Sequence, residues 1–211
     1  MKTEQLVASL VVDRAASTRP LGRAVGRAVV AGALVSLVIF AFEFGPRVDL
    51  AAAFETWRFD AKLVLVLSAL MAAIGACLAM ARPVVTTRWR RAVLPLLLIA
   101  AVALGTELAV LPAAAWKARL VGSNALVCLT AIPLFALAPL AALLLALRRA
   151  APASPALAGA AAGALAAAIA AVIYAFHCFD DSPLFVLTWY SLATIPVVLL
   201  GAAVGRRLLR W

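Results

Sequence analysis

The sequence predicts an all-α, polytopic membrane protein: a bundle of six transmembrane helices with both termini in the cytoplasm. Three observations lead to this prediction. Of the 211 residues, 67% are hydrophobic and 13% are charged, whereas a soluble domain is roughly 45–50% apolar and about 25% charged. The apolar residues form six long blocks, and Lys and Arg collect on alternate sides of them. This composition excludes a soluble domain, and it excludes a disordered chain, which requires low hydrophobicity.

The six apolar blocks have the length of membrane helices, since crossing about 30 Å of hydrocarbon takes roughly 20 residues. We expect spans at about 25–44, 61–81, 92–112, 125–147, 157–176 and 184–204. The first is short between its charges, and Arg27 and Glu43 can extend it by snorkelling. The chain accordingly divides into a cytoplasmic N-terminal arm (1–24), a transmembrane domain (25–205) and a basic cytoplasmic tail (206–211).

The basic residues orient these spans. Of 19 Lys and Arg residues, 14 fall on the side that holds both termini and five on the other. By the positive-inside rule the richer side is cytoplasmic, which predicts a multi-pass protein of the bacterial inner membrane, N-in and C-in. The net charge of +10 is explained in this way. It therefore indicates contact with the lipid bilayer and no direct nucleic-acid partner.

Two glycine pairs, Gly159-xxx-Gly163 and Gly201-xxx-Gly205, lie in the fifth and sixth spans. This spacing lets helices approach closely. In so alanine-rich a chain it also arises by chance, so a tight contact at either pair is a hypothesis.

The three cysteines are sorted by the predicted topology. Cys128 lies about one turn inside the outer end of the fourth span, and Cys178 lies just past the outer end of the fifth, whereas Cys77 lies near the inner end of the second. A disulfide needs two thiols in one compartment and close together, so only Cys128 and Cys178 can share one. The functional interpretation is a thiol pair that is oxidised or binds a soft metal. The alternative is two small buried hydrophobic residues.

The outer loop that carries Cys178 has the sequence HCFDDSP. His177 would lower the thiol pKa if charged, whereas Asp180 and Asp181 would raise it. The loop offers donor types of a metal site, but three donors within five residues lack the spacing of a structural zinc site, so no permanent metal is expected. Alternatively, Asp181 or Ser182 simply caps the last helix.

Glu43 and Glu107 are the acids within or at the edge of spans. Intramembrane acids are functional candidates by default. Both lie near outer helix ends, where snorkelling, or pairing with Arg47, Lys117 or Arg119, would give them a structural role. This disfavours a proton or ion path.

The N-terminal arm carries Leu6, Val7, Leu10 and Val11, which form one apolar stripe on a short helix. So short a helix is marginal in water. The arm is therefore a candidate docking segment for a protein partner. A lipid-surface anchor or a solvated tail fits the same pattern.

Signatures of catalysis are missing from the sequence, which has no CxxC, GxxxxGK[ST], HExxH or GxSxG and has only one histidine. We therefore expect no enzyme and no cofactor. A small inner-membrane transporter or channel, and a membrane redox protein, are the alternative functions.

Several stretches of the chain resemble the NrsF family of polytopic bacterial anti-sigma factors, "negative regulator of sigma-F". These are Cys128 followed by IPLFALAPLAALLLALRR (132–149), APASPALAGAAAGALAA (151–167), YAFHCFDDSPLFVLTWYSLA (174–193) and GRRLLRW (205–211). The most specific is the HCxxDSPxF…WY segment. Phe179 stands where family members often have proline after the second cysteine.

The resemblance implies a membrane-bound anti-sigma factor that sequesters an extracytoplasmic-function sigma factor. It also implies that Cys128 and Cys178 face the periplasm, and that oxidants or thiol-reactive heavy metals acting on them release the sigma factor. Cys77 has no counterpart in this comparison. A regulator of transcription in a stress response is thus the expected function.

Overall fold

A computed structural model describes residues 21–84 and 88–210 of the chain. Six helical stretches within these residues are long and apolar enough to cross a membrane, which confirms the all-α, six-span prediction. They are α2 (Leu21–Glu43), α4 (Trp57–Met80), α5 (Arg88–Val110), α7 (Ala125–Leu147), α8 (Pro155–Ala175) and a composite sixth stretch, Pro183–Leu208. The predicted docking residues of the arm, Leu6, Val7, Leu10 and Val11, lie outside the described part.

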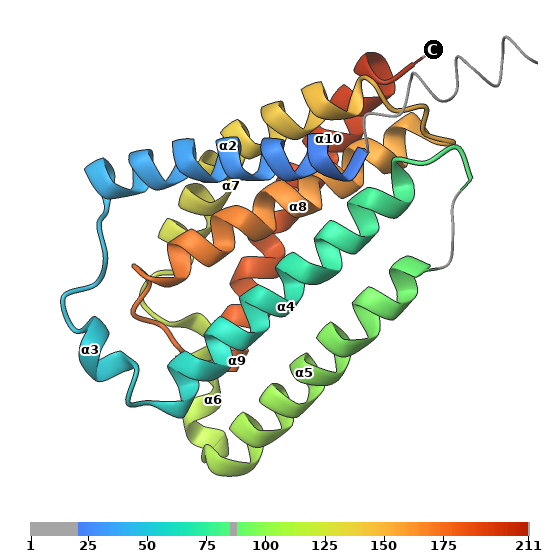
Figure 1. Cartoon of the computed structure of the whole chain (residues 1–211). Coiled ribbons are helices and arrows are strands. Elements are labelled where there is room, and N and C mark those ends of the chain that lie inside the picture. The colour runs from blue at the N-terminus through green and yellow to red at the C-terminus, as the bar shows by residue number, and fades with distance from the viewer. Residues whose placement is uncertain (1–20, 85–87, 211) are drawn as a thin grey trace, which may run out of the picture.

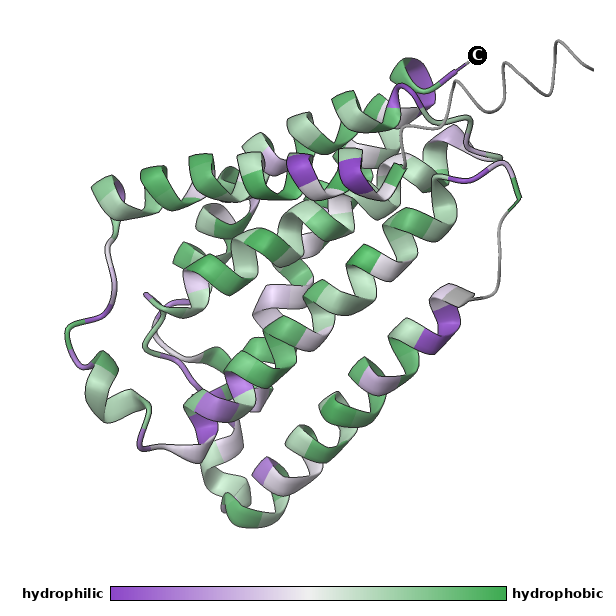
Figure 2. Cartoon of the chain, viewed as in Figure 1, coloured by the Kyte–Doolittle hydropathy of each residue, from purple (hydrophilic) through white to green (hydrophobic). Residues whose placement is uncertain are grey.

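The six stretches run back and forth between two ends of one bundle (Figure 1). One end, called the cap end here, holds α3 (Leu50–Ala53), α6 (Ala113–Val121) and the Cys178 loop (residues 176–182). The other, called the basic end, holds the first turn of α2, the 148–154 connection and the last turn of α10 (Ser191–Leu208). Figure 2 shows hydrophobic residues along the helices and hydrophilic ones gathered towards the ends and connections.

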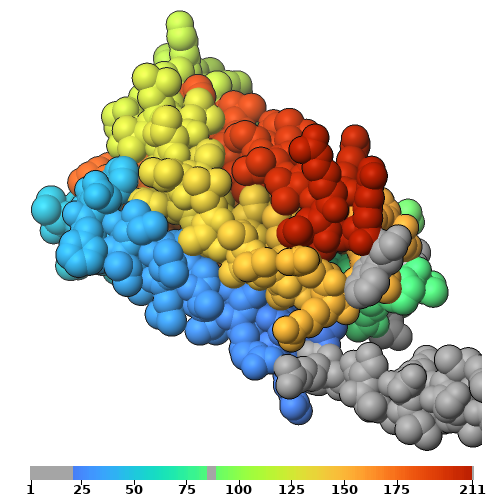
Figure 3. All heavy atoms as spheres, turned by 90° about the horizontal axis from the view of Figure 1, so that it is seen from above, coloured from blue at the N-terminus to red at the C-terminus, as the bar shows by residue number. Residues whose placement is uncertain are grey.

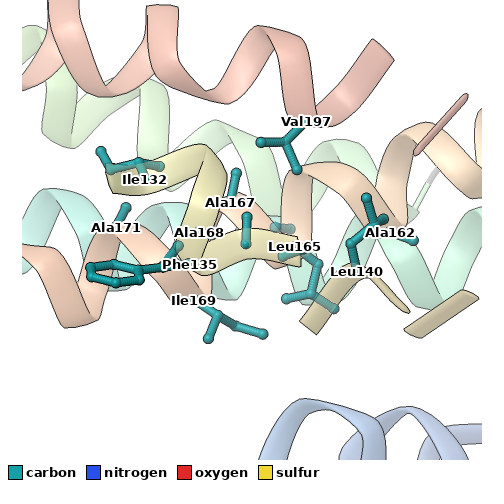
Figure 4. Close-up of a cluster of buried hydrophobic side chains, with 14 of the residues drawn as sticks. Ile132, Phe135, Leu140, Ala162, Leu165, Ala167, Ala168, Ile169, Ala171 and Val197 are labelled. Carbon is teal, nitrogen blue, oxygen red and sulfur yellow. The ribbon is translucent and has the colours of Figure 1, made fainter. Parts of the chain in front are cut away.

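Helix α8 forms the centre of the bundle. In an apolar window of 18 residues within α8, 72% of the residues are buried, against 11% in that of α5, which lies at the edge beside α4. Its sequence, PALAGAAAGALAAAIAAVIYA, is dominated by small residues, which let neighbouring helices approach closely. Side chains from α7 and α10 cover it, with Ile132, Phe135 and Val197 among them (Figure 4). On the face seen in Figure 3, α7 separates α2 from α10.

The two glycine pairs face each other across the contact between α8 and α10. A Cβ atom at Gly159 would lie 2.2 Å from the carbonyl oxygen of Gly201, and one at Gly201 would lie 2.3 Å from the carbonyl oxygen of Gly159. Gly163 and Gly205 are equally close to the opposite backbone. The hypothesis of a tight contact therefore holds for both pairs, because the two motifs form one interface.

Helices α2 and α7 meet at a proline. Pro139 lies inside α7 and has no N–H, so the carbonyl of Phe135, four residues earlier, lacks its helical donor. The hydroxyl of Ser36 on α2 donates to this carbonyl at 2.7 Å, and Ser36 is fully buried. Gly32, one turn earlier on α2, leaves room for the proline, since a Cβ there would lie 2.5 Å from its Cα. A neighbouring helix thus satisfies the backbone that the proline frees.

The sixth membrane-length stretch changes its winding. It begins as α9 (Pro183–Phe185), continues as a π-helical segment, η1 (Val186–Tyr190), and becomes α10 at Ser191. Such wide turns inside helices occur frequently at functional sites. Here the wide turn ends at Tyr190, which belongs to the same buried cluster as Cys128 and Cys178.

Candidate functional site: a buried thiol pair at the cap end

Cys128 and Cys178 meet at the cap end. Cys128 lies in the first turn of α7 and Cys178 lies in the loop after α8, and their Sγ atoms are 4.0 Å apart. Both side chains are fully buried, and both thiols are free. Cys77 is buried in the last turns of α4, towards the basic end. The structure therefore brings together Cys128 and Cys178, which the predicted topology placed on one side, and it places Cys77 away from them.

A buried lysine holds the Cys178 loop against α4. The ammonium of Lys62 donates to the backbone carbonyl of Cys178 at 2.7 Å and to Asp181 Oδ1 at 2.5 Å. Its side chain has no exposed surface, and that of Asp181 is 15% exposed. A buried charge needs a partner and hydrogen bonds, and this lysine finds both in the loop.

Arg47, from the segment between α2 and α3, reaches the same loop. Its guanidinium donates to Asp181 at 2.8 Å, to Asp49 at 2.7 Å and to the Cys178 carbonyl at 3.3 Å. The hydrogen bonds with Asp49, together with those to Asp181, raise the pKa of Arg47, and those from Arg47 lower the pKa of Asp49. Two cations on two different segments thus converge on one carbonyl and one carboxylate of the loop.

Asp180 ties the loop to the start of α7. Its Oδ2 accepts backbone N–H bonds from Ser123 at 2.9 Å and from Asn124 at 2.8 Å, just before the helix that carries Cys128. Carboxylates are favoured at such helix N-termini. Gly122 adopts φ +59°, and a Cβ there would lie 2.7 Å from Cγ of Asp180. The glycine therefore keeps this approach open.

His177 lies beside Cys178 in sequence, but its imidazole makes its contacts elsewhere. Nδ1 lies 3.0 Å from the carbonyl oxygen of Gly45, and the ring packs edge-on against Phe44. Of the three residues that we expected to modulate the thiol, Asp180 approaches it through its main chain, with its carbonyl oxygen 3.7 Å from Cys178 Sγ. Asp181 meets Lys62 and Arg47 instead.

Two tyrosines complete the surroundings of the thiols. The hydroxyls of Tyr174 and Tyr190 are buried and have no hydrogen-bond partner within the part of the chain that the structure describes. Their rings lie 6.0 Å apart, in the same buried cluster as both thiols. The pKa of Cys178 is lowered, first by the hydrogen bond from Cys128 and then by the charge of Lys62 and the hydroxyl of Tyr190, against the opposing effect of burial.

Glu107 belongs to a second ion pair at the cap end. It is fully buried, and it accepts from Arg58 at 3.0 Å and from the hydroxyl of Ser182 at 2.7 Å. The expected partners, Arg47, Lys117 or Arg119, were therefore wrong. Arg58 takes their place because α4 and α5 form an antiparallel hairpin, so the start of one lies beside the end of the other.

The side-chain cap expected for the last helix is also wrong. Ser182 occupies the N-cap position of α9, but its hydroxyl donates to Glu107.

The sequence did not indicate Lys62 or the two tyrosines as parts of the site, and it indicated Arg47 only as a partner for an acid at the end of a span. A signal existed for Lys62, which falls inside the expected span 61–81, where any ionisable residue is a functional candidate. The tyrosines carry no such signal, since only the fold brings them to the sulfur atoms.

The site can carry out thiol chemistry. Moving the two sulfur atoms from 4.0 Å to bonding distance, about 2.05 Å, would join α7 covalently to the loop. Among the described residues, no group of three or more His, Cys, Asp or Glu side chains is arranged to hold a metal ion.

Fold and site together define a class: a six-span helical membrane protein with a buried dithiol under an ion-paired loop. The family described as "NrsF: Negative regulator of sigma F" matches residues 10–211. The chain belongs to this family. It is similar to "Anti-sigma-F factor NrsF" of Caulobacter vibrioides (strain NA1000 / CB15N), with 38% identity over 66 residues. That stretch covers 31% of this chain and 31% of the relative, and no solved structure matches the chain.

Proposed function

We propose that this chain is an anti-sigma factor of the inner membrane. In this proposal it holds an extracytoplasmic-function sigma factor at the cytoplasmic face and releases it when Cys128 and Cys178 are oxidised or bind a heavy metal. The family description and the name of the Caulobacter relative support the regulatory part. The contact between the two thiols, 4.0 Å apart and closed off from solvent, supports the sensing part.

The orientation follows from the charges. Arginines in or near the basic end include Arg82, Arg148, Arg149, Arg206 and Arg207, so this end faces the cytoplasm by the positive-inside rule. The cap end then faces the periplasm, an oxidising compartment in which a disulfide persists.

The thiol pair is connected to several helices at once, which gives it a means of control. The Cys178 loop is held by Lys62 on α4, by Arg47 after α2 and by the start of α7 through Asp180. Closing the disulfide pulls α7 and the loop together and displaces these contacts. Closely packed helices favour discrete arrangements over gradual bending.

The signal reaches the opposite end along α8 and α10. Their glycine interface runs from Gly163 and Val197 to Pro155 and Gly205, close to the basic end. Because the backbones touch there, a shift of one helix requires a shift of the other. Release then follows if the sigma factor binds the two arrangements with different affinity.

The arm with Leu6, Val7, Leu10 and Val11 is the proposed docking segment. Its apolar stripe would fold on a partner helix, which is how amphipathic segments commonly bind a groove. The basic loops are the other surface available at this end.

Co-purification tests the proposal. The full chain and a variant without its first 20 residues are each produced with a tagged extracytoplasmic-function sigma factor from the same genome and solubilised in detergent. We expect the reduced full chain to retain the sigma factor and the shortened chain to lose it. A full-length variant with Leu6, Val7 and Leu10 changed to Ser keeps the length of the arm and removes its apolar stripe, so it shows which of the two the sigma factor needs.

Two results would count against the proposal. Failure of the full, reduced chain to retain any sigma factor encoded in the same genome contradicts the anti-sigma function. Retention by the shortened chain contradicts docking through the arm and moves docking to the basic loops.

A further inference from the structure

A groove in the membrane-embedded part of the bundle is lined in part by Tyr190, which belongs to the same buried cluster as the thiol pair. It has a volume of about 460 Å³ and lies between α4, α5, α8 and the sixth membrane-length stretch. Nearly all its lining side chains are apolar, among them Leu65, Ala72, Leu97 and Ala168. Its surroundings in the bilayer are therefore acyl chains.

The polar side chains of the groove are gathered at one place. They are Tyr190, the last residue of the π-helical segment, and Ser191 and Thr194, which follow it within about one helical turn. A groove with apolar walls and one polar site suits an amphiphile that has a hydrocarbon chain bearing an oxygen-containing group.

Tyr190 belongs to both the groove and the thiol site. It lines the groove, its buried hydroxyl has no hydrogen-bond partner among the described residues, and it belongs to the same buried cluster of side chains as Cys128 and Cys178. The thiols themselves have no exposed surface, and the ion-paired loop covers them at the cap end. Approach from the groove, on the side of Tyr190, avoids breaking these ion pairs.

We propose that the groove admits lipid-soluble hydroperoxides, such as peroxidised acyl chains, and delivers them from the bilayer to Cys178. This inference rests on the proposed function and names the chemical class of its signal. Water-soluble peroxide must instead open the ion-paired loop, so the two kinds of oxidant enter by different routes.

The reaction balances without another reagent. The thiolate of Cys178 attacks the terminal oxygen of the hydroperoxide, the O–O bond breaks, and Cys178 becomes a sulfenic acid. The alkoxide released takes a proton and leaves as the alcohol. Cys128 then attacks the sulfenic sulfur, which gives the disulfide and water. In sum, two thiols lose two electrons, and the hydroperoxide is reduced to an alcohol and water.

The residue Ala100 offers a way to close the groove, because it lines the groove from α5, the most loosely packed span. An Ala100→Phe variant fills the space. Ala101→Phe is the matched control, because Ala101 follows Ala100 on the same helix but is exposed and does not line the groove. Each full-length protein is placed in nanodiscs of saturated phospholipid, without sigma factor. Formation of the Cys128–Cys178 disulfide is followed by peptide mass spectrometry after alkylation.

With linoleic acid hydroperoxide, we expect Ala100→Phe to form the disulfide roughly tenfold more slowly, because a filled pocket cannot hold the chain. Its rate with hydrogen peroxide stays at the unmodified level, and Ala101→Phe changes neither rate. If Ala100→Phe forms the disulfide as fast as the unmodified chain with each of the two oxidants, the proposed route through the groove is wrong and the sensing proposal stands. Absence of the disulfide with every oxidant would overturn both.

Discussion

Lys62, a wholly buried lysine of α4, donates a hydrogen bond to the backbone carbonyl of Cys178, 116 residues away in the sequence. This bond connects α4 to the loop that carries Cys178. It also makes the loop dependent on a buried charge whose hydrogen-bond partners, among the described residues, are Asp181 and that carbonyl. The stability of this cluster is therefore a direct test of the site.

Asp181 is the common partner of Lys62 and Arg47, so its loss should cost more than the loss of either cation. Asp181→Asn leaves two cations facing one another, and we expect it to lower the free energy of unfolding by about 3–5 kcal/mol. Lys62→Met leaves Arg47 paired with Asp181 and should cost about 1–3 kcal/mol. Thermal unfolding in detergent measures both, and the opposite ranking would contradict the assigned pairing.

The pKa of Cys178 is lowered chiefly by the hydrogen bond from Cys128. A lowered pKa means that the thiolate, the reactive form, persists to lower pH than in an ordinary cysteine. Cys128→Ala removes the donor, so alkylation of Cys178 should require higher pH than in the unmodified chain. Cys128→Ser keeps a hydroxyl donor and should shift the profile less.

The pH profile is measured with a small neutral alkylating reagent, and the labelled peptide is quantified by mass spectrometry. Superimposable profiles for the alanine and serine variants would show that the Cys128 thiol does not set the reactivity of Cys178.

The glycine interface predicts a sharp positional effect. Gly201→Ala places a Cβ 2.3 Å from the Gly159 carbonyl oxygen, so α8 and α10 must separate. Overpacking of this kind costs about 1–3 kcal/mol or more. Gly105→Ala on α5 meets open space, and it should be neutral or stabilising by up to about 1 kcal/mol because alanine favours helices. Equal melting temperatures for the two variants would refute the close contact.

Ser36 and Pro139 should behave as a coupled pair. Ser36→Ala leaves the Phe135 carbonyl without its donor and should cost about 1–3 kcal/mol. In the double variant with Pro139→Ala, the new backbone N–H can bond to that carbonyl within α7, so the serine becomes dispensable. A double-mutant cycle measures the coupling, and strict additivity would mean that Ser36 does not serve this carbonyl.

The sequence was sufficient for the fold class because membrane spans are long, continuous apolar segments. Each expected span corresponds to a helix of the structure, including the short first one, which becomes α2 (Leu21–Glu43). The same topology placed Cys128 and Cys178 at one end, where they make contact. What could not be predicted is local winding: the wide turn at Val186–Tyr190 and the short helix Ala113–Val121 leave no comparable periodic signal.

The ion cluster escaped prediction for a different reason. Arg47 and Asp181 are 134 residues apart, and their pairing depends on how the helices pack rather than on spacing in the sequence. His177 was the expected neighbour of the Cys178 thiol because it is adjacent in the sequence, but its ring contacts the Gly45 carbonyl instead. Lys62, which is distant in the sequence, bonds to the Cys178 backbone. Buried cations in predicted spans are the better indicator of such a site.

The most direct test of the account is the affinity of the full chain for its sigma factor in two states of the thiol pair. The dissociation constant is measured in nanodiscs with Cys128 and Cys178 reduced, and again after their disulfide has been formed and verified by mass spectrometry. We predict at least about tenfold weaker binding in the oxidised state, a coupling of about 1.4 kcal/mol. A Cys77→Ser variant should behave like the unmodified chain, and a Cys178→Ser variant should bind equally before and after oxidant. Equal affinity of the reduced and disulfide-bonded chain would contradict the central claim.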